Sequence, residues 1–529
     1  MRKLTPVFVA LLLQLPATAL AGVVSGRVCS AEGAPLSGVC VSDGILCTTT
    51  DAEGRYSLAS DKPFGYVFIS SPSGYLPPLE GTRPQFFRYT SLKPSEDETL
   101  DFVLSEDKGQ ENHIMLCCTD FHMADLHSDR EQFDLWADDV QGFVADNPGS
   151  KVYMLTAGDM SWDIYWKTRH YSIEDFARDM DSHLAGLPVF YGIGNHDHEL
   201  EAAGERKSTF RYRKAIGPVY YSFNIGDVHY VVLDPVVSRN DGKGSRRYEC
   251  RIQEDQMRWL EAELQNVDKS RQVVVVSHIP IANLEDSQRL LDCFRNFSRP
   301  VHFITGHFHS LKNEDRLTDP EHPYYDHMVG CVSGSLWMTG HYSPGINLCK
   351  DGTPGGYMVL YCAADSLRWQ YKSTGRPLDY QFRLYDGNCV LLDPDTLIPN
   401  GSAANRELFS SLASSWMKPS SKNWLYLNVW NADGEWKVEM FEEGKALKVE
   451  RASFSDPLHI LSYPAKILSS AEDVVKPTQM TRKCSHFFRA KASRPDSVIE
   501  VLVTDRFGNV YRQSFERPLH FDIEYYKTH

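Results

Sequence analysis

The sequence has little of what marks several protein classes. Its 12 cysteines among 529 residues are too few for a disulfide scaffold, and none has the CxxC spacing of a zinc ribbon. The formal net charge is −15 and no basic stripe is present, so we expect no binding to a nucleic-acid backbone. Internal repeats and low-complexity tracts are missing as well. With 42% hydrophobic and 24% charged residues, the chain is expected to be globular, with about three domains.

Long apolar runs are also missing, apart from a short one near the N-terminus. Met1, Arg2 and Lys3 precede an apolar stretch at residues 7–15, and Ala19-Leu20-Ala21 follows it. A positive start, an apolar segment and an Ala-x-Ala site are typical of a secretory signal peptide, here cut after Ala21. The stretch is shorter than the roughly 20 residues of a membrane span, and no later segment qualifies. We expect an exported protein, periplasmic or extracellular, without a transmembrane segment; the alternative is a buried N-terminal helix.

The pattern of expected elements divides the rest of the chain into three domains. In residues 22–106, short runs of strand formers alternate with Gly, Pro and Asp clusters, which indicates a small β-sandwich. In residues 107–350, apolar strands alternate with amphipathic helices, which predicts an α/β layered sheet covered on both faces. Residues 351–529 predict a β-rich domain, with hairpin turns at residues 431–434 and 505–509.

Polar side chains follow five apolar strands of the central region. In chain order these strand ends read Asp120-Phe121-His122, Gly158-Asp159, Gly194-Asn195-His196-Asp197, Ser277-His278 and Gly306-His307-Phe308-His309. Each motif alone is common in turns and helix caps, where a structural role is the ordinary interpretation. In layered α/β sheets, however, ligands bind outside the carboxyl ends of the strands. We therefore expect these side chains to meet at one edge of the sheet.

Oxygen and nitrogen donors from five strand ends are enough to form a site for two metal ions. Paired ions about 3.5–4 Å apart clamp the attacking and leaving oxygens in phosphoryl chemistry and lower the pKa of a bound water. A mixture of imidazole and carboxylate donors suits zinc, manganese, iron or nickel rather than calcium. Two divalent ions would also leave the site with a net positive charge, so an acidic protein can bind an acidic ester.

This ordered set resembles the calcineurin-like metallophosphoesterase family, whose motifs D-x-H, G-D, G-N-H-D/E, H and G-H-x-H occur in the same order. All five are present here, and the layout is similar to the secreted bacterial subgroup with additional N- and C-terminal domains. The resemblance implies a central metallophosphoesterase α/β sandwich. It would be flanked by an N-terminal β-sandwich, similar to carboxypeptidase-regulatory or transthyretin-like domains, and by a C-terminal β-rich domain.

The resemblance also implies a role for each motif residue. Asp120, His122 and His309 would hold the first metal, Asp159 would bridge both, and Asn195, His278 and His307 would hold the second. A hydroxide between the metals would attack phosphorus, while His196 assists the leaving group and Asp197 orients its ring. Trp162 stands where purple acid phosphatases have a tyrosine, which argues against a ferric-tyrosinate centre. His198 is interpreted as a solvated loop histidine, with a substrate contact as the alternative.

Together these expectations describe an exported phosphoesterase that uses two divalent transition-metal ions to hydrolyse phosphate mono- or diesters. Aromatic and cationic residues in the loops beside the expected site suit an ester that carries a sugar, nucleoside or lipid group. The alternative is a surface glycan- or lipid-binding protein with a catalytically inert phosphoesterase scaffold, which the intact set of donors disfavours. The sequence leaves open the identity of the metals, the natural substrate, the choice between mono- and diesters, and the oligomeric state.

Overall fold

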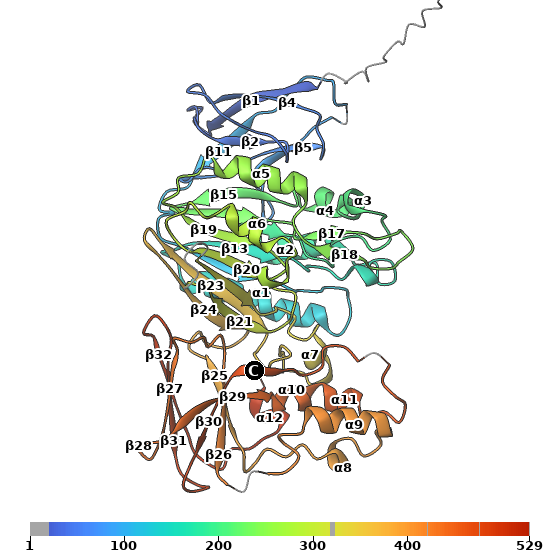
Figure 1. The fold of residues 1–529 in the computed structure, drawn as a ribbon, viewed down its shortest axis with the longest axis vertical. Helices are drawn as coiled ribbons and strands as arrows, with labels where there is room; N and C mark the ends of the chain where they lie inside the picture. Colours follow the sequence, from blue (N-terminus) through green and yellow to red (C-terminus); the bar gives the residue numbers. More distant parts are fainter. Residues whose placement is uncertain (1–20, 92, 318–322, 420–421, 476, 528–529) are drawn as a thin grey trace, which may run out of the picture.

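The computed structural model describes residues 21–91, 93–317, 323–419, 422–475 and 477–527. The expected signal peptide, apart from Ala21, lies outside the described residues. Figure 1 shows three bodies stacked along the long axis, with the N-terminal strands at one end, the central sheets in the middle and the C-terminal part at the other end. Within the described ranges, no helix combines the length and apolar character that crossing a bilayer requires.

The N-terminal body consists of two facing sheets, as the β-sandwich prediction stated. The first contains β1 (Gly22–Ser30), β4 (Arg55–Ser60), β10 (Glu98–Thr99), β11 (Phe102–Glu106) and β6 (Tyr75–Leu76), and the second has the order β3 (Cys47–Thr49), β2 (Cys40–Ser42), β5 (Tyr66–Ile69) and β9 (Phe87–Tyr89). A small ribbon of β7 (Leu79–Glu80) and β8 (Arg83–Pro84) follows β6 along the chain. The sandwich packs on the central body, where Phe68 meets Trp259 and the Tyr220 hydroxyl donates to the Gly44 carbonyl.

The central body contains two mixed sheets. The first has the order β14 (Val189–Gly192), β13 (Lys151–Ala157), β12 (His113–Cys118), β23 (Gly356–Ala363) and β24 (Ser366–Ser373). The second has the order β15 (Tyr221–Ile225), β16 (Val228–Val232), β19 (Gln272–Val276), β20 (Val301–Thr305), β22 (Tyr324–Val329) and β21 (Leu311–Asp315). Strands β12, β13 and β14 are parallel, as are β16, β19, β20 and β22, so in each set the carboxyl ends lie at one edge.

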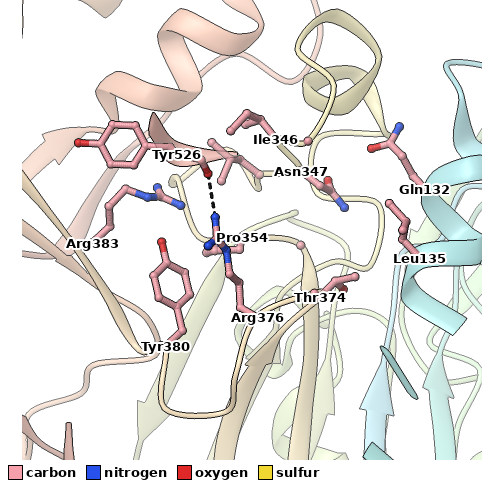
Figure 2. A pocket seen from close by; sticks show the side chains of 14 residues that line it. Gln132, Leu135, Ile346, Asn347, Pro354, Thr374, Arg376, Tyr380, Arg383 and Tyr526 are labelled. Carbon is pink, nitrogen blue, oxygen red and sulfur yellow. Dashed lines mark hydrogen bonds between the residues drawn. The ribbon is translucent and has the colours of Figure 1, made fainter. Parts of the chain in front are cut away.

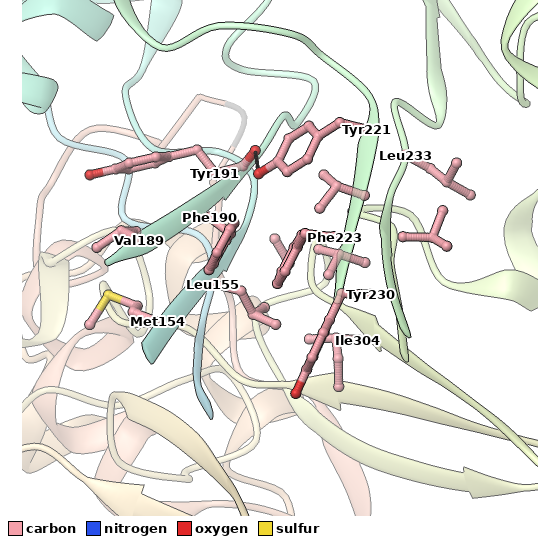
Figure 3. Packing of buried hydrophobic residues seen from close by; sticks show 14 of the residues in the cluster. Met154, Leu155, Val189, Phe190, Tyr191, Tyr221, Phe223, Tyr230, Leu233 and Ile304 are labelled. Carbon is pink, nitrogen blue, oxygen red and sulfur yellow. Dashed lines mark hydrogen bonds between the residues drawn. The ribbon is translucent and has the colours of Figure 1, made fainter. Parts of the chain in front are cut away.

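Apolar side chains fill the space between the two sheets. Figure 3 shows Phe190 of the first sheet beside Phe223 of the second, with ring centroids 3.6 Å apart, and Tyr230 beyond it. On the outer faces lie α1 (Asp129–Asp146) with α2 (Ile173–Leu184), and α5 (Glu254–Leu264) with α6 (Ser287–Asp292). The Tyr357 hydroxyl of β23 donates to Asp139 of α1, which ties α1 to the first sheet. This is the predicted α/β sandwich.

Shorter elements fill the connections around the central sheets. They are η1 (Asp163–Tyr165), α3 (Glu205–Ser208), α4 (Phe210–Ala215), β17 (Val236–Ser238), β18 (Tyr248–Cys250), η2 (Ile281–Asn283) and α7 (Met338–Tyr342). The ribbon of β17 and β18 and the helices α3 and α4 lie together on one side of the central body in Figure 1.

The predicted domain boundary at residue 350 is placed too early. Strands β23 and β24 follow this residue, yet β23 pairs along the length of β12, and the central sheet continues to Ser373. Both pairings are antiparallel, and only two residues separate β23 from β24. The boundary was missed because the prediction relied on strands alternating with helices, and an antiparallel pair needs no helix between its strands.

The C-terminal body combines two four-stranded sheets with short helices. One sheet contains β25 (Phe382–Asp386), β26 (Trp424–Val429), β30 (Lys483–Lys491) and β29 (Val449–Ser455), and the other contains β28 (Lys445–Ala446), β27 (Lys437–Glu442), β31 (Ile499–Thr504) and β32 (Val510–Phe515). The helices are α8 (Pro394–Leu397), α9 (Ala403–Leu412), α10 (Pro457–Ser462), α11 (Pro464–Ile467) and α12 (Ile523–Tyr526). The domain is rich in strands, as predicted.

One of the two predicted hairpins is confirmed and the other is wrong. Strands β31 and β32 pair antiparallel around residues 505–509, with Thr504 opposite Val510. Residues 431–434, by contrast, connect β26 of one sheet to β27 of the other, and these two strands do not pair. Turn residues mark where the chain reverses, but they do not determine which strand the next one pairs with.

A cavity of about 120 Å³ lies where the central and C-terminal bodies meet. Figure 2 shows Gln132 and Leu135 of α1 on one side and Arg383 and Tyr526 of the C-terminal body on the other. Arg376 crosses this region and donates to the Tyr526 carbonyl at 3.0 Å. The cavity lining includes none of the seven predicted metal donors.

Candidate metal centre

The predicted donors lie in tight turns directly after the central strands. The donors with positive φ angles, between 47° and 72°, are Asp120, His122, Asp159, His307 and His309. A non-glycine residue in this region costs about 1–3 kcal/mol, and several together need surrounding contacts that hold them. Here the turns hold each other, since the N–H groups of Asp120 and His122 donate to the Gly158 and Asp159 carbonyls at 3.0 and 2.9 Å. The strained turns direct the side chains into one space.

Asp120, His122 and His309 form the first donor group. The Nε2 atoms of the two imidazoles are 3.0 Å apart, and Asp120 Oδ1 lies 3.4 Å from that of His122 and 3.3 Å from that of His309. His309 Nδ1 donates to the Gly334 carbonyl at 2.9 Å, which leaves the Nε2 lone pair directed toward the group. Asp120 Oδ1 is buried and has no hydrogen-bond partner. A cation would satisfy these three inward-facing atoms together.

Asn195, His278 and His307 form the second donor group. Asn195 Oδ1 lies 2.9 Å from His307 Nδ1 and 3.2 Å from His278 Nε2. His278 Nδ1 donates to the Ala157 carbonyl at 2.7 Å. This bond fixes the ring with Nε2 toward the group, in the way that metal-binding histidines are commonly held through their other nitrogen.

Asp159 lies between the two donor groups. Its Oδ2 atom is 3.5 Å from His122 Nε2 and 3.1 Å from His278 Nε2, so a single oxygen faces both. Its Oδ1 atom accepts from the His196 backbone N–H at 2.7 Å. The structure therefore brings all seven predicted donors together, with Asp159 in the position that a bridging carboxylate requires.

The two carboxylates of the site are held in their ionised form. Burial alone would raise the pKa of Asp120 and of Asp159, but the neighbouring histidines hold both well below the usual range. Burial lowers the pKa of His307 to about 3, while the charge of Asp159 raises the pKa of His278 to about 9 against the effect of burial. Two ionised carboxylates are thus held in a space closed to most solvent.

The His196 ring is oriented by Asp163, and the prediction that Asp197 does this is wrong. His196 Nδ1 lies 2.9 Å from Asp163 Oδ1. The Asp197 carboxylate turns into the core and accepts instead from the backbone N–H groups of Met160, Ser161 and Gly194 at 2.9, 3.2 and 2.9 Å. Neighbouring residues of a tight turn point in different directions, so adjacency in sequence did not identify the partner.

Two residues beside His196 were not assigned by the sequence reasoning. Asp163 is fully buried, and Arg246 pairs with it, so that His196 and Arg246 share one carboxylate. Trp162 fills the place of the purple acid phosphatase tyrosine, and its ring centroid lies 5.7 Å from that of His122. The only sequence signal for Asp163 is its position four residues after Asp159, in the loop that follows β13.

The interpretation of His198 as a solvated loop residue is wrong. Its side chain is 2% exposed and contacts Ser208 and Asp234 rather than solvent. A position just outside a polar turn suggests exposure, but Ser208 of α3 and Asp234, which follows β16, contact the His198 ring.

Three consecutive parts of the chain match sequence models of three domains that occur together in one protein family. Residues 22–107 match the N-terminal domain of calcineurin-like phosphoesterases, residues 116–311 match the calcineurin-like phosphoesterase domain itself, and residues 326–511 match the C-terminal domain. The central match contains all seven donors. The chain belongs to the calcineurin-like phosphoesterases. The N-terminal match coincides with the first body of Figure 1, whereas the C-terminal match begins at residue 326 and so includes β23 and β24 of the central sheet.

Individual relatives match smaller parts of the phosphoesterase. Purple acid phosphatase 15 of Arabidopsis thaliana is 25% identical over 226 residues, which are 38% of each chain, so the phosphoesterase spans well under half of that relative. GAP50, the anchor in the inner membrane complex of Plasmodium, shares 16% identity at a TM-score of 0.32, covering 51% of this chain and 87% of its own. The 5'-nucleotidase of Candida albicans shares 13% identity at a TM-score of 0.31, covering 49% of this chain and 50% of its own.

Proposed function

We propose that this phosphoesterase is an exported hydrolase of phosphoric esters that works with two divalent transition-metal ions. The observation that carries the proposal is the position of Asp159, whose Oδ2 atom faces two separate groups of nitrogen and oxygen donors. The mixture of imidazole, amide and carboxylate fits zinc, manganese, iron or nickel. Asp120 Oδ1, buried without a partner, and the inward-facing His309 Nε2 fit a bound ion as well.

In this proposal each donor has a defined task. Asp120, His122 and His309 hold one ion, Asn195, His278 and His307 hold the other, and Asp159 reaches both. When bound, the two ions supply Lewis-acid activation of the phosphate and lower the pKa of a water molecule at the site. The carbonyls of Ala157 and Gly334 keep His278 and His309 oriented toward their ions.

His196 is proposed to assist the departure of the alcohol. It is the residue of the Asn195-His196 turn that stays partly open, with 22% of its side chain exposed, and its Nδ1 atom is occupied by Asp163. Its Nε2 atom is therefore available to donate a proton to the leaving oxygen. Asp163 acts as a positioning residue, because its bond to Nδ1 fixes the ring, while Arg246 pairs with Asp163 in turn.

The substrate is proposed to be a phosphate mono- or diester. A cavity of about 260 Å³ begins beside the metal centre at Phe308, which lies between the donors His307 and His309. Pro280 and the exposed cation Arg482 of the C-terminal body also line it. The same lining includes Asn283, Ser310, Lys312, Glu314 and Asp326. These polar and charged side chains support an ester whose organic part is polar, such as a sugar or nucleoside.

A screen for phosphate release tests the proposed function. Purified protein is stripped with a chelator, loaded with zinc, manganese, iron or nickel, and offered p-nitrophenyl phosphate, its bis ester, sugar phosphates, nucleotides and phospholipid headgroups. We expect hydrolysis that depends on added metal and is abolished by chelation. Protein that binds two ions per chain but releases neither phosphate from the monoesters nor p-nitrophenol from the bis ester would contradict the assignment.

A further inference from the structure

A second group of buried titratable side chains lies behind the His196 turn. His198 follows the turn, Glu205 begins α3 and Asp234 follows β16, so the three come from separate segments. One donor atom from each lies within 4.8 Å of the donor atoms of the other two. His198 and Asp234 are almost completely buried, and the side chain of Glu205 is 17% exposed. None of the three belongs to the seven donors described above.

Two atoms of this group are buried without a hydrogen-bond partner. They are His198 Nε2 and Asp234 Oδ2. His198 Nδ1 lies 3.2 Å from Ser208 Oγ, and this hydroxyl donates its own proton to the Glu205 carbonyl, so it accepts from the ring. The ring proton is therefore on Nδ1, and the lone pair of Nε2 points into the group.

The spacing of the donors is that of ligands around an ion. His198 Nε2, the nitrogen free to bind an ion, lies 3.4 Å from Asp234 Oδ1. Glu205 Oε2 lies 3.7 Å from the other ring nitrogen, Nδ1, and the donor atoms of all three residues still lie within 4.8 Å of one another. Hydrogen bonds to nitrogen are shorter, at about 2.7–3.2 Å, whereas tetrahedral ligands about 2.0–2.2 Å from zinc are roughly 3.3–3.6 Å apart. The proposed catalytic centre of the same molecule gives an internal standard, because Asp120 Oδ1 is 3.4 and 3.3 Å from its two imidazole nitrogens.

Among the described residues, the His198 imidazole is the only side chain that pairs with the two carboxylates of the group. Among the residues that the structure describes, no lysine or arginine forms an ion pair with Glu205 or Asp234. The guanidinium of Arg213 donates to the carbonyls of Phe64 and Arg206 instead. Glu205 Oε2 accepts from the Ser238 N–H at 2.6 Å, a bond that fixes the carboxylate without neutralising it. One imidazole cannot neutralise two buried carboxylates, and burial raises the pKa of Glu205 to about 7. A bound divalent cation would stabilise the ionised form of both.

We propose that His198, Glu205 and Asp234 bind a third divalent transition-metal ion, with zinc as the best fit. One imidazole and two carboxylates match the donors of zinc sites, with water as the fourth ligand, whereas calcium takes six to eight oxygens. The ion is structural. It ties the turn that carries Asn195 and His196 to α3 and to the end of β16, and so holds the proposed catalytic turn from behind.

Anomalous diffraction from crystals of the full mature chain grown with zinc tests the proposal without any substitution. We expect an anomalous peak at the zinc edge between His198 and Asp234, separate from the peaks at the dinuclear centre. The competing arrangement is a protonated imidazole: burial lowers the pKa of His198, but the charges of Asp234 and Glu205 raise it to about 9. Peaks at the dinuclear centre alone, with His198 Nε2 closed onto Asp234 at hydrogen-bonding distance, would overturn the proposal.

Metal content gives a second, independent readout. After loading with zinc and gel filtration, the unmodified protein should hold about one ion per chain more than the Asp234→Asn or Glu205→Gln variant. The matched control is Glu263→Gln, which removes a buried carboxylate that faces His229 at 3.2 Å without a third donor. This variant should keep the full metal content. Equal content in all four folded proteins would contradict a third site.

Discussion

The second central sheet carries buried histidines of two kinds. His302 of β20 and His327 of β22 lie within the strands, and His302 Nδ1 contacts His327 Nε2 at 3.0 Å. His309 follows the end of β20, and its Nε2 contacts the His122 Nε2 at the same 3.0 Å. In the first pair, His327 Nδ1 bonds to Asn313 and the ring packs on Trp369, so neutral rings share an ordinary hydrogen bond. A short distance between imidazoles is therefore no sign of a metal.

Carboxylates and backbone strain distinguish the second pair from the first. Asp120 Oδ1 lies against both His122 and His309, and all three residues have left-handed backbone. His302 and His327 have no left-handed backbone and keep regular strand conformation. A fold that holds strained turns around ionised carboxylates must gain something from them, and metal binding supplies that gain.

The largest loss of metal binding and activity is expected from Asp159→Ala, and it would separate the donor groups from the structural histidine pair. Because Asp159 faces both donor groups, its loss should lower the metal content and reduce the hydrolysis of p-nitrophenyl phosphate by about a thousandfold or more. The control is His302→Phe, which removes a buried imidazole from β20, in the interior of the second central sheet and outside the two donor groups. Metal analysis and initial rates should show no more than a small change in the control. Full activity of Asp159→Ala with unchanged metal content would remove the distinction between the two regions.

The next largest effect is expected at the turn that carries Asn195 and His196, where the two residues should differ in what their loss changes. His196→Ala should keep both ions and lose about 10²–10⁴-fold in kcat, because only proton donation to the leaving oxygen is removed. The loss should be greatest for alkyl esters, whose leaving groups need the proton most. Asn195→Ala should instead weaken the binding of one ion.

Titration of stripped protein with manganese, followed by activity at saturating metal, distinguishes the two variants. A saturating metal concentration should restore most of the activity of Asn195→Ala, whereas the activity of His196→Ala should stay low. If metal binding were weakened equally in both, the proposed division of tasks in this turn would be wrong.

The sequence allowed the donors to be predicted but not the partner of His196. Asp120, His278 and His309 were recognised because each follows an apolar run, and parallel strands bring such ends to one edge. Which carboxylate meets the His196 ring depends on how two loops cross in space, and nothing in the order of residues identifies Asp163 before Asp197. A choice of this kind is made by packing between segments far apart in the chain.

The same limit applies to the fold. The three bodies, and the five central strands that end in polar side chains, were predicted from alternating polarity and from turn residues. Strands β23 and β24 were assigned to the wrong domain, and residues 431–434 were assigned to a hairpin, because both depend on which strands pair. Pairing between distant strands is fixed by the complementarity of whole surfaces, which local patterns do not contain.

A smaller effect on kcat is expected when Asp163, the carboxylate that contacts the His196 ring, is compared with Asp197, which does not. Asp163→Asn should lower kcat by about 10–100-fold with little change in KM, and should increase the dependence of the rate on the leaving group. Asp197→Asn should leave that dependence unchanged and lower the midpoint of thermal unfolding, because an amide cannot accept from all three backbone N–H groups. Rates over a series of aryl phosphates, together with thermal unfolding, test both. An unchanged leaving-group dependence in Asp163→Asn would show that it does not position His196.

The smallest effect concerns the structural histidines, and it depends on pH. Burial lowers the pKa of His302 to about 3, so the folded protein keeps this ring neutral where an unfolded chain protonates it. The unfolded state therefore binds more protons between about pH 6.5 and pH 3, and stability falls as the pH drops through this window. His302→Phe should remove about 2 kcal/mol of that loss at pH 5 relative to pH 7.5. Urea unfolding followed by the fluorescence of the tryptophans, which include the adjacent Trp369, measures it, and an identical stability difference between variant and parent at both pH values would contradict a neutral buried ring.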